Sequence, residues 1–270
     1  MRSAKMNSSK WQSRPMLLMC LLYLLAPSTV AALETRETMT ILAEDAAPPW
    51  SEHDGTGYAN DVVVAAFKEM AVDVQLKVVP YARCKYMVLN GTNIACFNMS
   101  WSPEFEGKVK LAAQPIYTVN NDIFEQVDAP LPKPSKGTCT LPPGTVVGSV
   151  RDYEYSTQAT ALRSAGIVFE SAESDGQNLR KLAARRLSAA LIVTSDLEAK
   201  EQKAKLAGTE EAVRFAFSCG VVTATIGFSL THPDGLRALK IYEEGYRRIQ
   251  ANGVLEQIHI RRFPSQPVVD

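Results

Sequence analysis

The feature that most constrains the fold is an alternation of short apolar runs with amphipathic helical stretches. The alternation extends from residue 38 to residue 97, breaks at a proline-rich segment over 128–144, and then restarts. Short apolar runs indicate buried strands, whereas apolar residues spaced three and four apart indicate helices. Strands that alternate with helices favour α/β units on a largely parallel sheet, so we expect two such units in one chain.

The first unit is bounded by clear breaking signals. Pro48 and Pro49 forbid continuation of its first strand, and Asn90-Gly91 stops its second helix. The expected elements are strands over 38–43, 74–79 and 94–97 and helices over 62–70 and 81–89.

The second unit is entered and left through two crossing segments, expected over 122–127 and 213–217. The proline-rich stretch that follows the first crossing is typical of a surface loop. The remaining expected elements are strands over 145–150, 167–169, 189–193 and 223–228, helices ending near 164 and spanning 177–186 and 234–251, and a short last turn over 254–258.

The first 32 residues resemble a targeting segment. Four basic residues precede an apolar run over 16–25, and Val30-Ala31-Ala32 is similar to an A-x-A cleavage site. The run is shorter than the roughly 20 residues that a membrane span needs, although a short anchor helix is the alternative. We expect a cleaved signal peptide over 1–32 and a periplasmic mature chain, whose net charge of 25 − 29 = −4 follows from losing four of the 29 basic residues.

Export would place the remaining cysteines in an oxidising compartment, where disulfides form. Cys84, Cys96, Cys139 and Cys219 allow three pairings. Cys84 and Cys96 flank a short turn and are the favoured local pair, with buried free thiols as the alternative. Cys139 and Cys219 are far apart in sequence and pair only if the fold brings the chain near Cys219 back to the chain near Cys139. A zinc site is not expected, because no C-x-x-C occurs and the three histidines are scattered.

Composition and motifs argue against several function classes. The chain has 29 basic and 29 acidic residues and no basic patch with interleaved aromatic residues, so we expect no nucleic-acid partner. It carries no G-x-S-x-G, H-E-x-x-H or P-loop sequence, and His53 between Glu52 and Asp54 is typical of a solvated turn. We therefore expect a protein that is not an enzyme and that holds neither a cofactor nor a metal.

Several short stretches, none of them specific alone, occur in a fixed order over most of the chain. They are Pro48-Pro49-Trp50, Gly57–Asp61, Val79–Arg83 with Leu89–Gly91, Met99–Phe105, Gln114–Tyr117, Val147–Asp152, and Asn252-Gly253 with Ile258. In this order they resemble motifs of the family 3 extracellular solute-binding proteins of bacteria, the periplasmic receptors of polar amino-acid transporters.

The resemblance implies an α/β, type II periplasmic binding protein fold, with two lobes joined by two hinge strands. Lobe 1 would comprise residues 33–125 and 216–270, and lobe 2 residues 126–215. A small polar solute would be held between the lobes for an ABC-type transporter permease or a sensor, and the protein would be a monomer. Hinge segments close such lobes by absorbing the change in backbone dihedrals.

Two departures from the family pattern bear on the ligand. Amino-acid receptors of the family carry an arginine where this chain has Phe105, and phenylalanine cannot supply the bidentate, charge-assisted grip of a guanidinium on an α-carboxylate. The aspartate that commonly holds the α-ammonium group is also displaced, because the acid after the 189–193 strand is Asp196. An amino-acid ligand is therefore less expected than the family name suggests.

Candidate ligand-binding residues in the first lobe follow from these motifs. Trp50 comes after two prolines and offers a flat face for stacking, with packing in the lobe core as the alternative. Trp101 is a candidate in the next motif, where Ser100 and Ser102 on either side of it offer hydroxyl and backbone donors. Phe105 fills the space that the arginine would occupy.

In the second lobe, the candidates lie in the loop before its first helix. Ser149, Arg151 and Asp152 begin this loop, and backbone amides at such a place suit an anionic group. Tyr153 and Tyr155 follow and are candidates to close over the ligand.

Two other functions remain open at this stage. An enzyme on the same scaffold, such as a dehydratase, would need an ionisable acid/base pair facing the cleft. A degenerate family member would instead bind a protein partner and leave the cleft idle. Fold alone does not separate these possibilities, because one fold hosts many functions.

Overall fold

The computed structural model describes residues 36–264, which belong to a single unit rich in internal contacts. The signal peptide expected over residues 1–32 lies outside the described residues. No helix within 36–264 combines the length and the apolar character that crossing a bilayer requires.

β1 (Glu37–Glu44) is the centre of a first group of strands. It runs parallel to β4 (Val72–Val79) along its whole length and to β5 (Ala95–Met99) near Leu42. Helix α1 (Tyr58–Glu69) makes the crossover that parallel neighbours require. This first strand group therefore contains the parallel α/β unit that the sequence predicts.

Helix α2 (Tyr81–Leu89) has the bounds expected from the sequence. Pro80 precedes it, at a position where a missing N–H costs nothing, and Asn90 follows its last residue. The helix is tied to β5 by a disulfide between Cys84 and Cys96, whose Cα atoms lie 5.7 Å apart.

β8 (Val146–Val150) is the centre of a second strand group and runs parallel to both of its neighbours. Val147 and Val150 are buried and Val146 is partly buried, as expected for a parallel strand covered on both faces. The other elements of this group are β9 (Val168–Ala172), β10 (Ala189–Thr194), α3 (Thr157–Ala161), a 3₁₀ turn (Leu162–Ala165), α4 (Asp175–Ala183) and α5 (Glu201–Leu206).

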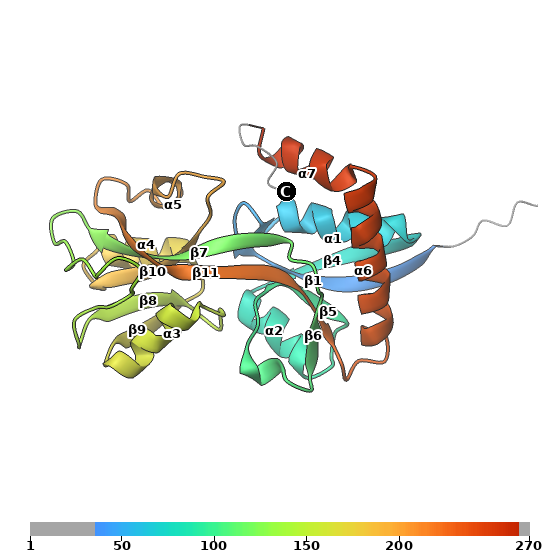
Figure 1. The fold of residues 1–270 in the computed structure, drawn as a ribbon, viewed down its shortest axis with the longest axis horizontal. Helices are drawn as coiled ribbons and strands as arrows, with labels where there is room; N and C mark the ends of the chain where they lie inside the picture. Colours follow the sequence, from blue (N-terminus) through green and yellow to red (C-terminus); the bar gives the residue numbers. More distant parts are fainter. Residues whose placement is uncertain (1–35, 265–270) are drawn as a thin grey trace, which may run out of the picture. The chain divides into compact units, whose positions relative to one another are not determined.

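Two antiparallel strands, β7 (Tyr117–Gln126) and β11 (Val213–Ser229), run through both groups and lie side by side (Figure 1). The sequence predicts two separate segments over 213–217 and 223–228, whereas the structure has one strand of 17 residues. Irregularities between Phe215 and Phe217 and between Ser218 and Val221 accommodate extra residues, so pairing with β7 continues through them.

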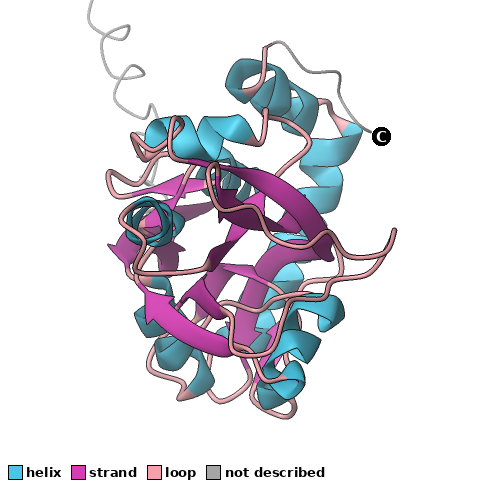
Figure 2. Cartoon of the chain, turned by 90° about the vertical axis from the view of Figure 1, so that its left-hand side faces the viewer, coloured by secondary structure: helices cyan, strands magenta, loops and turns pink. Residues whose placement is uncertain are grey.

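The main path of the sheet has the order β4-β1-β5-β11-β7-β10-β8-β9, with β6 (Val109–Leu111) also paired to β11, and helices flank the sheet on both sides (Figure 2). Helix α1 packs with α6 (Gly235–Ala251) and α7 (Val254–Arg262) over the largest apolar core. The sequence predicts α6 to within one residue but expects only a short turn where α7 forms.

Several short elements are absent from the sequence-based prediction. Two- or three-residue strands and single helical turns carry almost no periodic signal, because their pairing depends on neighbours that are distant in sequence. They are β2 (Ala46–Ala47), β3 (Ser51–Glu52), the 3₁₀ turn η1 (Pro103–Phe105), β6 (Val109–Leu111) and α5.

The proline-rich segment is tied to β11 by a second disulfide. Cys139 and Cys219 are 80 residues apart in sequence, and their Cα atoms lie 4.9 Å apart. The fold brings these two segments together as the pairing requires, because β11 runs antiparallel along β7, the strand that precedes the proline-rich segment.

Candidate functional site

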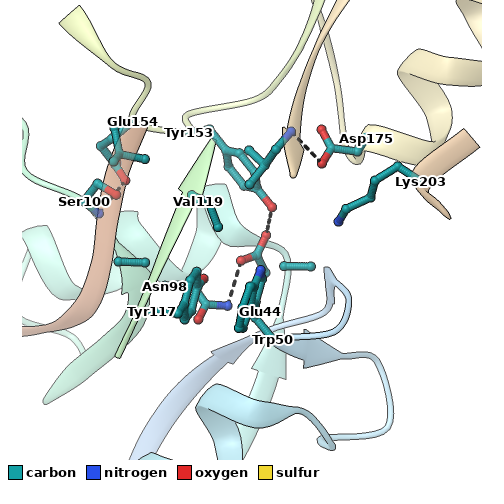
Figure 3. Close-up of a pocket in the computed structure, with 14 residues that line it drawn as sticks. Glu44, Trp50, Asn98, Ser100, Tyr117, Val119, Tyr153, Glu154, Asp175 and Lys203 are labelled. Atoms are coloured by element: carbon teal, nitrogen blue, oxygen red, sulfur yellow. Dashed lines mark hydrogen bonds between the residues drawn. The ribbon is translucent and has the colours of Figure 1, made fainter. Parts of the chain in front are cut away.

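A small, partly open cavity of about 30 Å³ lies among residues of both strand groups (Figure 3). One water needs roughly 10–15 Å³ of such space, so the cavity holds about two waters. Aromatic, acidic and amide side chains dominate its wall. The polar and aromatic residues that line it are Glu44, Trp50, Asn98, Ser100, Tyr117, Tyr153, Glu154, Asp175 and Lys203.

Trp50 forms one aromatic wall of the cavity. Its ring stacks on that of Tyr117, with centroids 4.0 Å apart and an interplanar angle of 4°, and only 2% of the residue is exposed. Its carbonyl oxygen accepts from the Ala59 N–H of α1 at 2.9 Å. The loop after the two prolines is thereby attached to the start of a helix, which holds the tryptophan in place.

Gly57 allows this close approach. Its φ is +141°, and a Cβ at this position would lie 2.2 Å from the Trp50 carbonyl oxygen. We expect Gly57→Ala to destabilise the protein by about 3 kcal/mol or more, since it adds a backbone clash to the strain of positive φ. The emission of Trp50 should change as its loop moves, which urea unfolding followed by fluorescence would measure.

Gly107→Ala is the matched control for this substitution. Gly107 also has a positive φ, of +71°, but a Cβ there would meet no atom within 4 Å. Gly107→Ala should therefore lower the free energy of unfolding by only about 1 kcal/mol and leave the fluorescence emission of the folded protein unchanged. Equal losses for the two variants would contradict a role of Gly57 in seating Trp50.

Glu44 ends β1 and faces the cavity with its carboxylate. Its Oε1 accepts from the Tyr153 hydroxyl, and its Oε2 accepts from Asn98 Nδ2 at 3.0 Å. Burial raises the pKa of Glu44 to about 7, and the hydrogen bonds from Tyr153 and Asn98 oppose this shift only in part. A charged Glu44 is therefore costly to the empty protein.

Asp175 begins α4 and carries the second cavity carboxylate. Its Oδ2 accepts from the Val193 N–H at 3.2 Å, whereas its Oδ1 is buried and accepts no hydrogen bond within residues 36–264. Burial raises the pKa of Asp175 to about 6 against the opposing charge of Lys203. Lys203 itself donates from Nζ to the Pro48 carbonyl oxygen at 2.8 Å.

Glu154 is held by donors of the first strand group. Its Oε2 accepts from the Tyr81 hydroxyl and from the Ser100 N–H at 3.2 Å, and its Oε1 pairs with Lys85 Nζ at 3.0 Å. Burial disfavours the charged lysine, but the carboxylates of Glu154 and Glu104 outweigh it and raise the pKa of Lys85. Glu154 is thus a fully engaged carboxylate.

The structure brings two of the first-lobe candidates to the cavity, Trp50 and Ser100. Trp101 is 69% exposed and is not part of the cavity wall. Ser102 lies outside the wall, with its hydroxyl 3.3 Å from Glu104. Phe105 is 2% exposed and packs in an apolar cluster around the Cys84–Cys96 disulfide.

None of the second-lobe candidates Ser149, Arg151 and Asp152 lines the cavity. Ser149 is buried in β8, opposite β9, and Arg151 pairs with Glu173 at 3.0 Å. Asp152 has a φ of +61°, and its carbonyl oxygen accepts from Lys85 Nζ at 2.7 Å. The left-handed residue turns the chain here, and the residues after it face the cavity instead.

Sequence reasoning missed Glu44, Asn98, Glu154, Asp175 and Lys203. A usable signal exists for Glu44, because it is an acid at the carboxyl end of an apolar parallel strand, where ligands of α/β sheets bind. Tyr153 was a candidate and lines the cavity, whereas the hydroxyl oxygen of Tyr155 accepts from the Val150 N–H at 2.8 Å.

No protein-family model and no curated protein sequence matches this chain. Solved structures do match it in fold. A histidine kinase sensor domain with similarity to periplasmic binding proteins is 16% identical, with a TM-score of 0.70 over 84% of this chain and 96% of that chain. The GluR0 ligand-binding core from Nostoc punctiforme, in complex with L-glutamate, is 15% identical, with a TM-score of 0.66 over 83% and 99%.

A third structure with this fold is the ancestral amino-acid-binding protein AncCDT-1, a precursor of cyclohexadienyl dehydratase. It is 17% identical, with a TM-score of 0.62 over 84% of this chain and 96% of that chain. The α/β arrangement of residues 36–264 is thus the two-lobed fold of periplasmic binding proteins, as the sequence predicts.

Proposed function

We propose that this chain is a solute-binding protein, exported to the periplasm, that captures a small polar molecule and presents it to an ABC-type transporter or a sensor. Lobe 1 would be residues 33–125 and 216–270, lobe 2 residues 126–215, with β7 and β11 as hinge strands. The observation that carries the proposal is the cavity, whose wall combines both strand groups and includes residues with buried oxygen acceptors that have no donor within residues 36–264.

The contacts around the cavity suit a closing mechanism. Tyr153 reaches Glu44, and Lys203 reaches the Pro48 carbonyl oxygen, so each contact joins the two strand groups beside the cavity. A ligand stabilises such a closed form by the contacts that it makes only there. Opening at the hinge strands would break these contacts and admit the solute.

Binding of a solute should raise the thermal stability of this protein. A solute at a hundred times its Kd should stabilise the folded protein by about 2.7 kcal/mol. For a chain of this size, that corresponds to a rise in Tm of roughly 5–10 °C. Differential scanning fluorimetry of the mature protein against a panel of polar metabolites would measure it.

The two tryptophans provide a matched pair of variants for this screen. Trp50→Ala should abolish the ligand-induced rise in Tm, because Trp50 lines the cavity. Trp101→Ala should preserve it, because Trp101 is exposed and lies outside the cavity wall. If no solute shifts the Tm of the parent protein, the proposal is wrong and an accessory that binds a protein partner becomes the better reading.

A dehydratase-like enzyme is the second candidate, and Glu44 is the observation in its favour. A carboxyl with a pKa of about 7 beside a tyrosine hydroxyl suits general acid–base catalysis near neutral pH. Mass spectrometry of the solute after incubation separates the two functions. Recovery of unchanged solute supports binding alone, whereas conversion over many turnovers would establish an enzyme.

A further inference from the structure

The cavity presents hydrogen-bond acceptors that lack donors. Asp175 and Asn98 both line it, and the Oδ1 atom of each is buried and accepts no hydrogen bond within the described residues. The other amide atom of Asn98 donates to Glu44, which determines that its oxygen is the free one. A buried acceptor without a partner costs roughly 1–3 kcal/mol, so a guest that brings N–H donors would relieve this cost.

The donors near the cavity are, in contrast, already engaged. The Tyr81 hydroxyl, Lys85 Nζ and the Ser100 N–H all converge on the carboxylate of Glu154. Glu154 therefore occupies, from within the chain, the place where these three donors would hold a carboxylate of a ligand. A second carboxylate would find no free donor in this cluster and would meet the charge of Glu154.

The remaining ionisable groups on the wall are mainly acidic. Glu44 and Asp175 face the cavity, while Glu154 is balanced by its ion pair with Lys85. Lys203 is the cation on the wall; its ammonium group donates to the Pro48 carbonyl oxygen, and its charge favours the ionised form of Asp175. The described hydrogen-bond donors to Glu44 and Asp175 are all neutral, so a cationic guest would bring these carboxylates a direct ion pair.

Aromatic rings complete a site suited to a cation. Trp50, Tyr117 and Tyr153 line the same cavity as the two carboxylates. The face of an aromatic ring attracts a cation within about 6 Å of its centroid, and more strongly where water is excluded. Carboxylates and aromatic rings together are the surroundings that an organic ammonium or guanidinium group prefers.

We propose that the cavity binds an organic cation with an ammonium or guanidinium head and no carboxylate of its own, with Glu154 filling the place of that carboxylate. This inference rests on the proposed solute-binding function and names its substrate class. The closed cavity, of about 30 Å³, accepts only the cationic head, so a longer guest requires Tyr153 to move.

Pairs of compounds that differ only in the carboxylate provide the test. Isothermal titration calorimetry would compare agmatine with L-arginine and cadaverine with L-lysine on the mature protein. At least one amine should bind about 100-fold more tightly than its amino acid. Equal or tighter binding of the amino acid, or no binding of either amine, would overturn the inference.

Failure of this inference is distinguishable from failure of the proposed function. If the amines do not bind but another solute raises the Tm through Trp50, the protein is still a solute-binding protein with a different substrate class. If no solute binds at all, both proposals are wrong.

Variants test the roles of the individual carboxylates. Asp175→Asn should weaken amine binding at least tenfold, whereas Glu173→Gln, which alters an exposed acid outside the cavity, should leave it unchanged. Glu154→Ala should free its three donors and bring L-arginine to within tenfold of agmatine. Glu154→Gln retains the side chain's size and provides a second variant if the alanine protein does not fold.

A Glu154→Ala protein that folds yet still excludes L-arginine by 100-fold would contradict the role given to Glu154. Circular dichroism of each variant would establish that it is folded before its affinity is compared.

Discussion

Raising the pH from 4.5 to about 7 should lower the free energy of unfolding of the empty protein by about 3 kcal/mol through Glu44 alone. In the unfolded chain this carboxyl loses its proton near its ordinary pKa of 4.5, whereas the folded protein keeps the proton until about pH 7. Between these values the unfolded state binds fewer protons, so stability falls as the pH rises. The loss is complete about one pH unit above 7 and is constant beyond that.

Glu44→Gln isolates this contribution. The neighbouring charges of Asp175 and Asp45 also raise the pKa of Glu44, and Asp175 has its own raised pKa, so the total pH profile contains more than one group. The difference in unfolding free energy between parent and variant reports Glu44, because the other groups are common to both. Urea unfolding at pH 5, 6, 7 and 8 would give this difference.

We expect the variant to gain stability relative to the parent as the pH rises to 8. The Asn98 amide can turn to accept from the new side chain, since its Oδ1 has no other partner within the described residues. Glu106→Gln, which removes an exposed acid, should show no such trend. A parent–variant difference that does not change with pH would contradict the burial of an uncompensated carboxyl at this position.

Removing the Cys139–Cys219 disulfide should lower the free energy of unfolding by about 4–5 kcal/mol. The bridge closes a loop of 80 residues, so its loss greatly increases the conformational entropy of the unfolded chain. The Cys84–Cys96 disulfide closes a separation of only 12 residues, so its removal should cost roughly 3 kcal/mol. Double Cys→Ala variants at each bridge, unfolded in urea, would measure both losses without leaving a free thiol.

The longer bridge should also matter for the cavity. The Cys219 carbonyl oxygen accepts from the Ser156 hydroxyl, and the Ser156 N–H donates to Asn121 Oδ1 at 2.6 Å, so both β7 and β11 hold the loop that carries Tyr153 and Glu154. We expect loss of the Cys139–Cys219 bridge to weaken solute binding, whereas loss of the Cys84–Cys96 bridge should mainly lower the stability of the fold. A larger stability loss at the shorter bridge would contradict the loop-entropy argument.

The regular elements could be predicted because their signals are local. Helix α2 follows Pro80 and stops at Asn90, so its bounds depend on breakers adjacent in the chain. The strands of both groups are apolar runs between such breakers. β11 differs, because its continuity through two irregularities depends on pairing with β7, about a hundred residues earlier.

The candidate site could be predicted only in part. Trp50 and Ser100 carry motif signals and line the cavity, whereas Phe105 shares a motif with Ser100 and is turned into the apolar core by η1. In the second lobe, the sequence identifies the loop after β8 but not which of its side chains point into the cavity. The left-handed backbone at Asp152 decides that the side chains after it face the cavity, and such a turn at a non-glycine residue has no reliable sequence signal.

The sequence by itself determined the alternation of strands and helices in two α/β units and the cysteines able to form bridges, because periodicity and chain breakers act over a few residues. The two-lobed fold was implied by the resemblance of its motifs to solute-binding proteins. Only the tertiary structure decided that Glu44 and Asp175 share one cavity and that Glu154 engages the donors beside it. Those residues lie on separate elements. They meet because the parallel strands of each group, joined by β7 and β11, bring segments that are distant in sequence to one place.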